Sequence, residues 1–103
     1  MTTTFISRHA GAKDWIESKG FNIDNFIAHA TPEFFAALQV GDAVIGILPV
    51  ALAAKVCEAG ATYYDLALPN LPAEWRGLEL TPDQMNQAGA TLSRYNIVKI
   101  RKM

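Results

Sequence analysis

The chain lacks the features of a secreted or membrane protein. Its single cysteine, Cys57, cannot form an internal disulfide, so we interpret it as a buried thiol in a reducing compartment. The longest apolar run, residues 43–54, is interrupted by Gly46 and Pro49 and is too short to span a bilayer. The first residues lack the basic and apolar regions of a secretion signal, and we therefore expect a cytoplasmic protein without membrane contact.

The motifs of the commonest cofactor and metal sites are also missing. There is no GxGxxG fingerprint, no Walker phosphate loop, no HExxH pair and no cysteine–histidine cluster. The two histidines have no carboxylate near them in the sequence, so we expect neither a metal ion nor another cofactor. The net charge of −1 disfavours a broad basic face, and we therefore expect no duplex nucleic acid among the partners.

What the chain does contain is enough apolar material for one compact domain. It has 103 residues, of which 50% are hydrophobic and 18% are charged, a balance typical of globular proteins. A chain of this length buries roughly two-thirds of its unfolded surface without help from metals or disulfides. We therefore expect residues 1–103 to form a single domain.

Apolar periodicity and turn signals predict strands that alternate with helices. The predicted strands cover residues 3–7, 23–28, 43–48, 62–68 and 96–101. The predicted helices cover residues 11–19, 32–38, 50–59 and a segment from Pro82 through Tyr95. The third of these helices is apolar almost all round, which predicts deep packing. This order predicts an α/β protein with a small Rossmann-like three-layer fold and a mostly parallel five-stranded sheet.

The predicted topology brings several polar tips to one edge of the sheet. Residues 7–9 follow the first strand, His29 follows the second, the turn of residues 46–49 follows the third, and the loop with Arg76 follows the fourth. Ligands of such sheets bind outside the carboxyl ends of the strands. We therefore expect the function of the chain to lie at this edge.

The junction between the first strand and the first helix collects groups that bind anions. Arg8 has a guanidinium suited to bidentate phosphate binding, and His9 has an imidazole able to transfer a proton. Gly11 permits close approach to the helix N-terminus, whose free N–H groups favour phosphate. Ser7 and Lys13 complete the predicted site. The alternatives are that Arg8 and His9 are only a surface pair, that Ser7 only caps the turn and that Lys13 is only a solvated helix residue. We predict a phosphate-bearing ligand here.

Two further segments are candidates for the opposite wall of the pocket. Gly46, Leu48 and Pro49 lie in the turn after the third strand, where a helix N-terminus would face the ligand. The alternative is a glycine that relieves crowding and a proline that starts a helix. Arg76 is a candidate second guanidinium for a polyanionic ligand, and its alternative is a contact with the nearby Glu79 that anchors the loop.

Three short motifs occur in a fixed order along the chain. They are Ser7-Arg8-His9-Ala-Gly11-Ala12, then Gly41-Asp42 with Val44-Ile-Gly46-Ile-Leu48-Pro49-Val50, then Arg76-Gly77-Leu-Glu79-Leu80. Together they resemble a small accessory family of CRISPR-associated proteins from type III loci, over essentially the whole chain. The resemblance implies a fold related to CARF domains, a homodimer, and a link to cyclic oligoadenylates, the second messengers of type III systems.

Members of this group resemble ring nucleases, so the resemblance implies that the chain linearises cyclic tetra-adenylate and switches the response off. Two half-sites across a two-fold axis would match the symmetry of this ring. Metal-independent cleavage would use a ribose 2′-hydroxyl as the nucleophile. We then expect Arg8 to clamp phosphate, His9 to transfer a proton, Ser7 to orient the ligand and Arg76 to close over it. The alternatives are a non-catalytic sensor or sponge for the same ligand and an unrelated Rossmann-like structural partner.

Overall fold

Strands and helices alternate along the chain. The computed structural model describes residues 1–103, apart from the side chain of Ala10. The described elements are β1 (Thr3–Ile6), α1 (Ala10–Ser18), β2 (Asn25–Ile27), α2 (Pro32–Ala37), β3 (Ala43–Gly46), α3 (Val50–Glu58), β4 (Thr62–Ala67), the 3-10 helix η1 (Ala73–Trp75), α4 (Pro82–Gln87) and β5 (Thr91–Tyr95). The predicted alternation is therefore confirmed, with somewhat shorter strands.

The strands form one sheet in the order β2-β1-β3-β4-β5. β1 pairs in parallel with both β2 and β3, which places Phe5 beside Phe26 and Ile45. β3 pairs in parallel with β4, whereas β5 runs antiparallel to β4 at the outer edge. The mostly parallel five-stranded sheet of a small Rossmann-like fold is thus confirmed, and the carboxyl ends of β1 to β4 share one edge.

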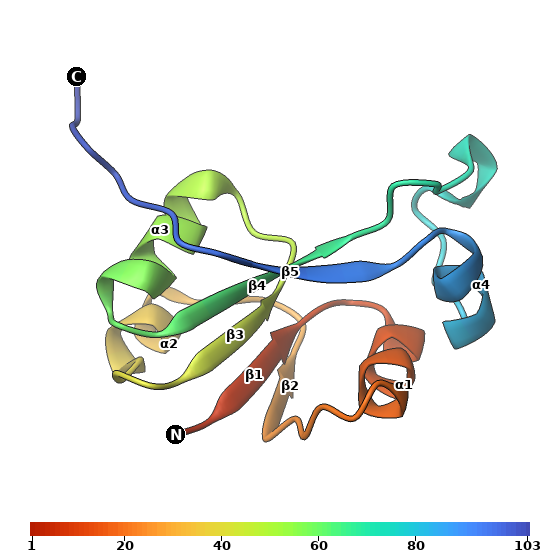
Figure 1. Cartoon of the computed structure of the whole chain (residues 1–103), viewed down its shortest axis with the longest axis horizontal. Helices are drawn as coiled ribbons and strands as arrows, with labels where there is room; N and C mark the ends of the chain where they lie inside the picture. Colours follow the sequence, from red (N-terminus) through yellow and green to blue (C-terminus); the bar gives the residue numbers. More distant parts are fainter.

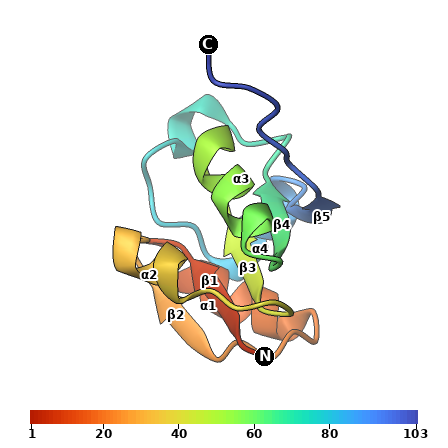
Figure 2. The same ribbon diagram turned by 90° about the vertical axis from the view of Figure 1, so that its left-hand side faces the viewer.

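Helices cover both faces of the sheet, and Figures 1 and 2 show the resulting layers. The buried residues of the face covered by α1 and α4 include Phe5, Trp15, Ile16, Ile45 and Met85. Those of the face covered by α2 and α3 include Val44, Ala53, Val56 and Tyr63. Because successive residues of a strand point to opposite faces, Val44 serves one core and Ile45 the other. β3 is therefore buried on both faces, as its continuous apolar sequence predicted.

Local signals in the sequence set where several helices begin and end. The side chains of Thr31 and Thr81 accept hydrogen bonds from the N–H groups of Phe34 and Gln84, both at 3.2 Å. Gln84 also accepts a hydrogen bond from the Thr81 N–H, which completes the predicted capping box of α4. After α1, Gly20 has a φ of 91°, the left-handed geometry that ends a helix and favours glycine.

The last strand lies earlier in the chain than the sequence predicted. The predicted strand over residues 96–101 is wrong, because β5 is Thr91–Tyr95 and these later residues are described as lying outside any strand. The predicted fourth helix is also too long, since α4 ends at Gln87. Gly89 then takes a φ of 75°, which terminates the helix and turns the chain. Pairing with β4 outweighs the helical spacing of the apolar residues that follow.

The first turn of α3 is less buried than its apolar sequence predicted. Ala53 and Val56 are fully buried, but Val50 is 70% exposed. Residues 97–101 run beside this exposed side and leave a groove of about 540 Å³ between themselves and α3. Figure 1 shows this C-terminal segment leaving the body of the fold after β5. The prediction that α3 packs deeply on all sides is therefore wrong for its first turn.

Candidate functional site

A cavity of about 420 Å³ lies at the carboxyl ends of the parallel strands. Its walls come from the tips of β1, β2 and β3, from the end of β4, and from α1, α3 and α4. Four of its lining side chains are polar, namely Ser7, Arg8, His9 and His29, and the others are apolar. The edge of the sheet at which the topology predicted a ligand therefore carries a cavity.

The β1–α1 junction holds its polar tip in a defined shape. The Ser7 hydroxyl oxygen accepts a hydrogen bond from the His9 N–H at 3.1 Å, which gives Ser7 a turn-capping role. The Ser7 N–H donates to the carbonyl oxygen of Ile27 at 2.9 Å and so ties the tip of β1 to the tip of β2. The Ser7 hydroxyl retains its own proton for donation to a ligand. Arg8 is exposed at the mouth of the cavity, where its guanidinium is accessible.

The imidazole of His9 has one nitrogen that the fold does not use. Its Nδ1 is buried and has no hydrogen-bond partner among the described atoms. Buried polar groups are nearly always paired in folded proteins, and an unpaired one costs about 1–3 kcal/mol. His9 is also the N-cap residue of α1 but makes no side-chain cap bond. Its side chain lines the cavity, so a bound ligand could supply the missing partner.

The β3–α3 turn is held by a tyrosine for which the sequence pattern predicted no role in the site. The Tyr63 hydroxyl accepts a hydrogen bond from the Leu48 N–H at 3.0 Å and donates to Oδ1 of Asp65 at 2.7 Å. It also lies 3.2 Å from the carbonyl oxygen of Gly46. Burial raises the pKa of Tyr63, and the hydrogen bond to Asp65 raises it further, so the hydroxyl keeps its proton. The sequence signal that could have indicated this role of Tyr63 is the Tyr-x-Asp spacing, which places both side chains on one face of β4.

Gly11 and Gly46 were predicted to lie close to a ligand. In the structure, each of them lies close to another part of the protein. A Cβ on Gly11 would overlap the carbonyl oxygen of Leu80, so glycine allows the start of α1 to pack against that segment. A Cβ on Gly46 would lie 3.1 Å from the carbonyl oxygen of Ile6, a tight contact between β3 and β1. Leu80 and Ile6 both line the cavity. These glycines therefore shape the cavity wall by close packing.

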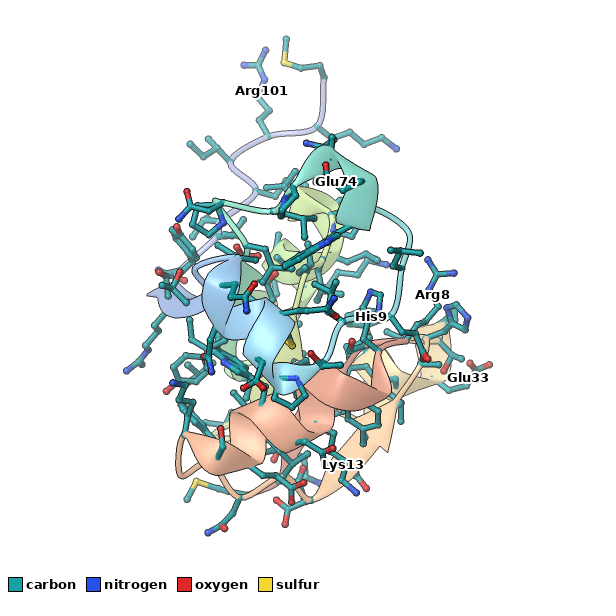
Figure 3. The ribbon with its side chains drawn as sticks, turned by 90° about the vertical axis from the view of Figure 1, so that its right-hand side faces the viewer. Arg8, His9, Lys13, Glu33, Glu74 and Arg101 are labelled. Atoms are coloured by element: carbon teal, nitrogen blue, oxygen red, sulfur yellow. The ribbon has the colours of Figure 1, made fainter. Side chains whose placement is uncertain are left out.

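Three other predicted ligand-binding residues lie outside the cavity lining. Lys13, Pro49 and Arg76 are exposed, and the lining does not include them. Figure 3 shows Lys13 pointing away from Arg8 and His9, on the other side of α1. Pro49 is the N-cap residue of α3, and Arg76 follows η1. In the predicted turn after β3, Ile47 and Leu48 contribute to the lining.

The cavity presents hydrogen-bond donors and positive charge, and its described lining contains no acidic side chain. A guanidinium, a hydroxyl and two imidazoles are groups that suit an anion. In the part of the chain that the structure describes, no three histidine, cysteine, aspartate or glutamate side chains lie close enough to hold a metal ion. A membrane-spanning helix is likewise missing from the described residues, since none is both long and apolar enough.

The fold and the cavity together define a class, a small Rossmann-like α/β protein with an anion-compatible cavity at the carboxyl edge of its sheet. Residues 4–98 match the family model described as "Putative CRISPR-associated protein (Cas_VVA1548)". Because the match spans nearly the whole chain, the protein belongs to this family of CRISPR-associated proteins, in agreement with the resemblance of its motifs. A search of curated proteins and a search of solved structures found no match.

Proposed function

We propose that this CRISPR-associated protein is a ring nuclease, which binds cyclic tetra-adenylate in the cavity and linearises it to end type III signalling. The observation that carries the proposal is the cluster of Ser7, Arg8, His9 and His29 at the tips of β1 and β2. These groups suit a phosphodiester because they combine positive charge, hydrogen-bond donors and a side chain able to transfer a proton. Family membership supports a ligand that belongs to CRISPR defence.

The proposed reaction asks the protein mainly for positioning and charge stabilisation. A ribose 2′-oxygen attacks the adjacent phosphorus, and the bond from phosphorus to the 5′-oxygen of the next nucleotide breaks. The 2′-hydroxyl loses its proton to solvent, and the departing 5′-oxygen gains one from His9. The product is a linear oligoadenylate with a 2′,3′-cyclic phosphate at one end and a 5′-hydroxyl at the other. Holding the 2′-oxygen in line with the departing oxygen supplies much of the rate acceleration.

Three of the four polar side chains of the cavity have a proposed part in this step. Arg8 binds the non-bridging phosphate oxygens and stabilises the charge that develops on them. His9 transfers a proton to the departing 5′-oxygen. The Ser7 hydroxyl donates a hydrogen bond that orients the phosphate, since its oxygen already accepts the His9 N–H. Arg76 lies outside the cavity lining, so this proposal gives it no direct contact with the reacting phosphate.

We propose further that the protein acts as a homodimer. One cavity of about 420 Å³ is small for a ring of four nucleotides, and a two-fold axis would bring two such cavities to one symmetric ligand. Val50, Val98 and Ile100 are 70%, 65% and 94% exposed beside the groove between α3 and the C-terminal segment. Burial of these apolar side chains against a second copy would stabilise the dimer. Sedimentation of the protein with and without cyclic tetra-adenylate tests this, and a monomer under both conditions contradicts it.

The experiment that tests the function is incubation of the purified protein with radiolabelled cyclic tetra-adenylate in the presence of EDTA. Ring and linear forms are separated on a gel, and we expect the linear product to accumulate. A ring that is bound but unchanged after prolonged incubation contradicts the nuclease and leaves a sensor or sponge. A ring that neither binds nor changes the thermal stability of the protein contradicts the ligand itself.

A further inference from the structure

The polar side chains of the cavity and most of its large apolar side chains come from different parts of the sheet, although Ile6 of β1 also lines it. The polar ones follow β1 and β2, which are neighbours at one end of the strand order. The leucines and the methionine come from the tips of β3 and β4, from α3, and from α4 with the segment before it: Leu48, Leu52, Leu66, Leu68, Leu80 and Met85. The cavity therefore has a polar half and an apolar half, side by side along the strand order.

Two of the apolar lining residues do not serve the hydrophobic core. Ile47 is 64% exposed, and Leu52 on α3 is half-buried. Neither belongs to the two described core clusters, whereas the neighbouring Leu48 packs against the α3 side of the core. An apolar side chain that lines an open cavity gains little from folding, but it gains from an apolar ligand group. Ile47 and Leu52 are therefore explained by a ligand better than by packing.

We propose that the apolar half of the cavity holds a nucleobase while the polar half holds its phosphate, an inference that rests on the proposed function. β1 and β4 are two strand positions apart, or about 10 Å, which suits the reach of one nucleotide from phosphate to base. The cavity of about 420 Å³ falls near the lower end of the usual range for small-molecule sites, about 300–1,000 Å³. Each cavity therefore has room for one nucleotide unit of the ligand.

The base is held by burial and is not read at its edge by side chains. The described lining places no polar side chain among the leucines and the methionine of the apolar half. Apolar pockets discriminate weakly between ligands of the same shape, typically by no more than about 100-fold when one polar group differs. Adenine and hypoxanthine should therefore bind this half within about 100-fold of each other.

The test is an NMR titration of the full chain with three probes: adenosine 5′-monophosphate, inosine 5′-monophosphate and ribose 5-phosphate. We expect both nucleotides to bind at least about tenfold more tightly than ribose 5-phosphate, because only they bury a base. Equal affinities for adenosine 5′-monophosphate and ribose 5-phosphate overturn the proposal. A preference above about 100-fold for one nucleotide over the other overturns the claim that side chains do not read the base.

Substitutions in the apolar half test its contribution to binding separately from that of the polar half. Ile47→Ser and Leu52→Ser should each lower the affinity for the nucleotides several-fold and leave that for ribose 5-phosphate unchanged. Val40→Ser is the matched control, because Val40 is 81% exposed and lines neither this cavity nor the groove beside α3. An equal loss in the control, or no loss in either cavity variant, overturns the proposal.

The base subsite and the proposed function can fail independently of each other in these experiments. Cleavage of cyclic tetra-adenylate together with equal binding of nucleotide and ribose 5-phosphate would retain the nuclease and overturn the base subsite. Selective binding of the nucleotides by a protein that leaves the ring intact would retain the base subsite and overturn the nuclease.

Discussion

The hydroxyl of Tyr63 accepts a hydrogen bond from the N–H of Leu48 at 3.0 Å, across 15 residues of sequence. Tyr63 is 1% exposed and donates in turn to Asp65. Through these two hydrogen bonds, β4 holds the turn that follows β3. This turn contributes Ile47 and Leu48 to the cavity wall. A side chain of the core thus determines the shape of the candidate site.

Tyr63→Phe should lower the free energy of unfolding by about 1–3 kcal/mol, because the Leu48 N–H loses its acceptor. It should also weaken ligand binding, since the turn is less well held. Denaturant unfolding and ligand titration measure the two effects. Tyr64→Phe is the matched control, because the described residues offer the Tyr64 hydroxyl no hydrogen bond and its ring packs edge-on against Phe21. Equal effects of the two changes would contradict the role of the Tyr63 hydroxyl.

Asp42→Asn should destabilise the protein at neutral pH but not in strong acid. The carboxylate accepts hydrogen bonds from the N–H groups of Thr2 and Gln39, both at 2.9 Å, and these bonds hold the pKa of Asp42 below its ordinary value of 3.8. A lowered native pKa means that the stabilisation is present above about pH 3.8 and is lost as the pH falls through the native pKa. Urea unfolding of both proteins between pH 7 and pH 2.5 measures the difference.

The control for this pH dependence is Asp14→Asn, which changes an exposed carboxylate on α1. We expect its unfolding curve to follow the wild type at each pH. A deficit of Asp42→Asn that persists unchanged at the lowest pH would contradict the assignment to the ionised carboxylate.

Gly11→Ala should lower the free energy of unfolding by about 1–3 kcal/mol, because the added methyl group would overlap the carbonyl oxygen of Leu80. Gly77→Ala provides the comparison, since Gly77 has open space around its Cα but a φ of 81° that disfavours alanine by about 1 kcal/mol. Chemical unfolding measures both. If Gly11→Ala is at least as stable as the wild type, then α1 does not need the close approach between Gly11 and Leu80.

Arg8→Ala should weaken the binding of cyclic tetra-adenylate by at least about tenfold, because a charge-assisted hydrogen bond to phosphate contributes about 1.5–3 kcal/mol. Arg94→Ala is the matched control, since Arg94 is exposed on β5 and lies outside the cavity lining. Fluorescence or calorimetric titration at fixed salt measures both affinities. An equal loss of affinity in the two variants would show that binding depends on the overall charge of the protein and not on the cavity.

The order of the elements could be predicted because each depends on local signals. Thr31 and Thr81 begin helices through their side-chain caps, and Gly20 ends one through its positive φ. The final strand could not be placed in the same way. Residues 91–95 satisfy a helical apolar spacing as well as a strand, and only pairing with β4, which is distant in sequence, decides between them. Gly89 was the one local sign that the helix stops.

The position of the cavity could be predicted, but only part of its lining. Parallel topology is sufficient to bring Ser7, Arg8, His9 and His29 to one edge, because the direction of the strands alone places their carboxyl ends there. The apolar half depends on how α3 and α4 pack over the sheet, which a periodic pattern does not specify. The role of Tyr63 could not be predicted either, because it depends on a hydrogen bond between β4 and the turn after β3.

The most direct test of the account compares cleavage and binding of cyclic tetra-adenylate by the wild type and by His9→Ala, in EDTA. The His9 side chain makes no cap bond to α1, so its removal should leave the helix in place. We predict that the single-turnover cleavage rate falls by about 10²–10⁴-fold, as expected for loss of a general acid, while the dissociation constant changes by less than about tenfold. Equal cleavage rates for the two proteins would contradict the proposed role of His9 in the cavity.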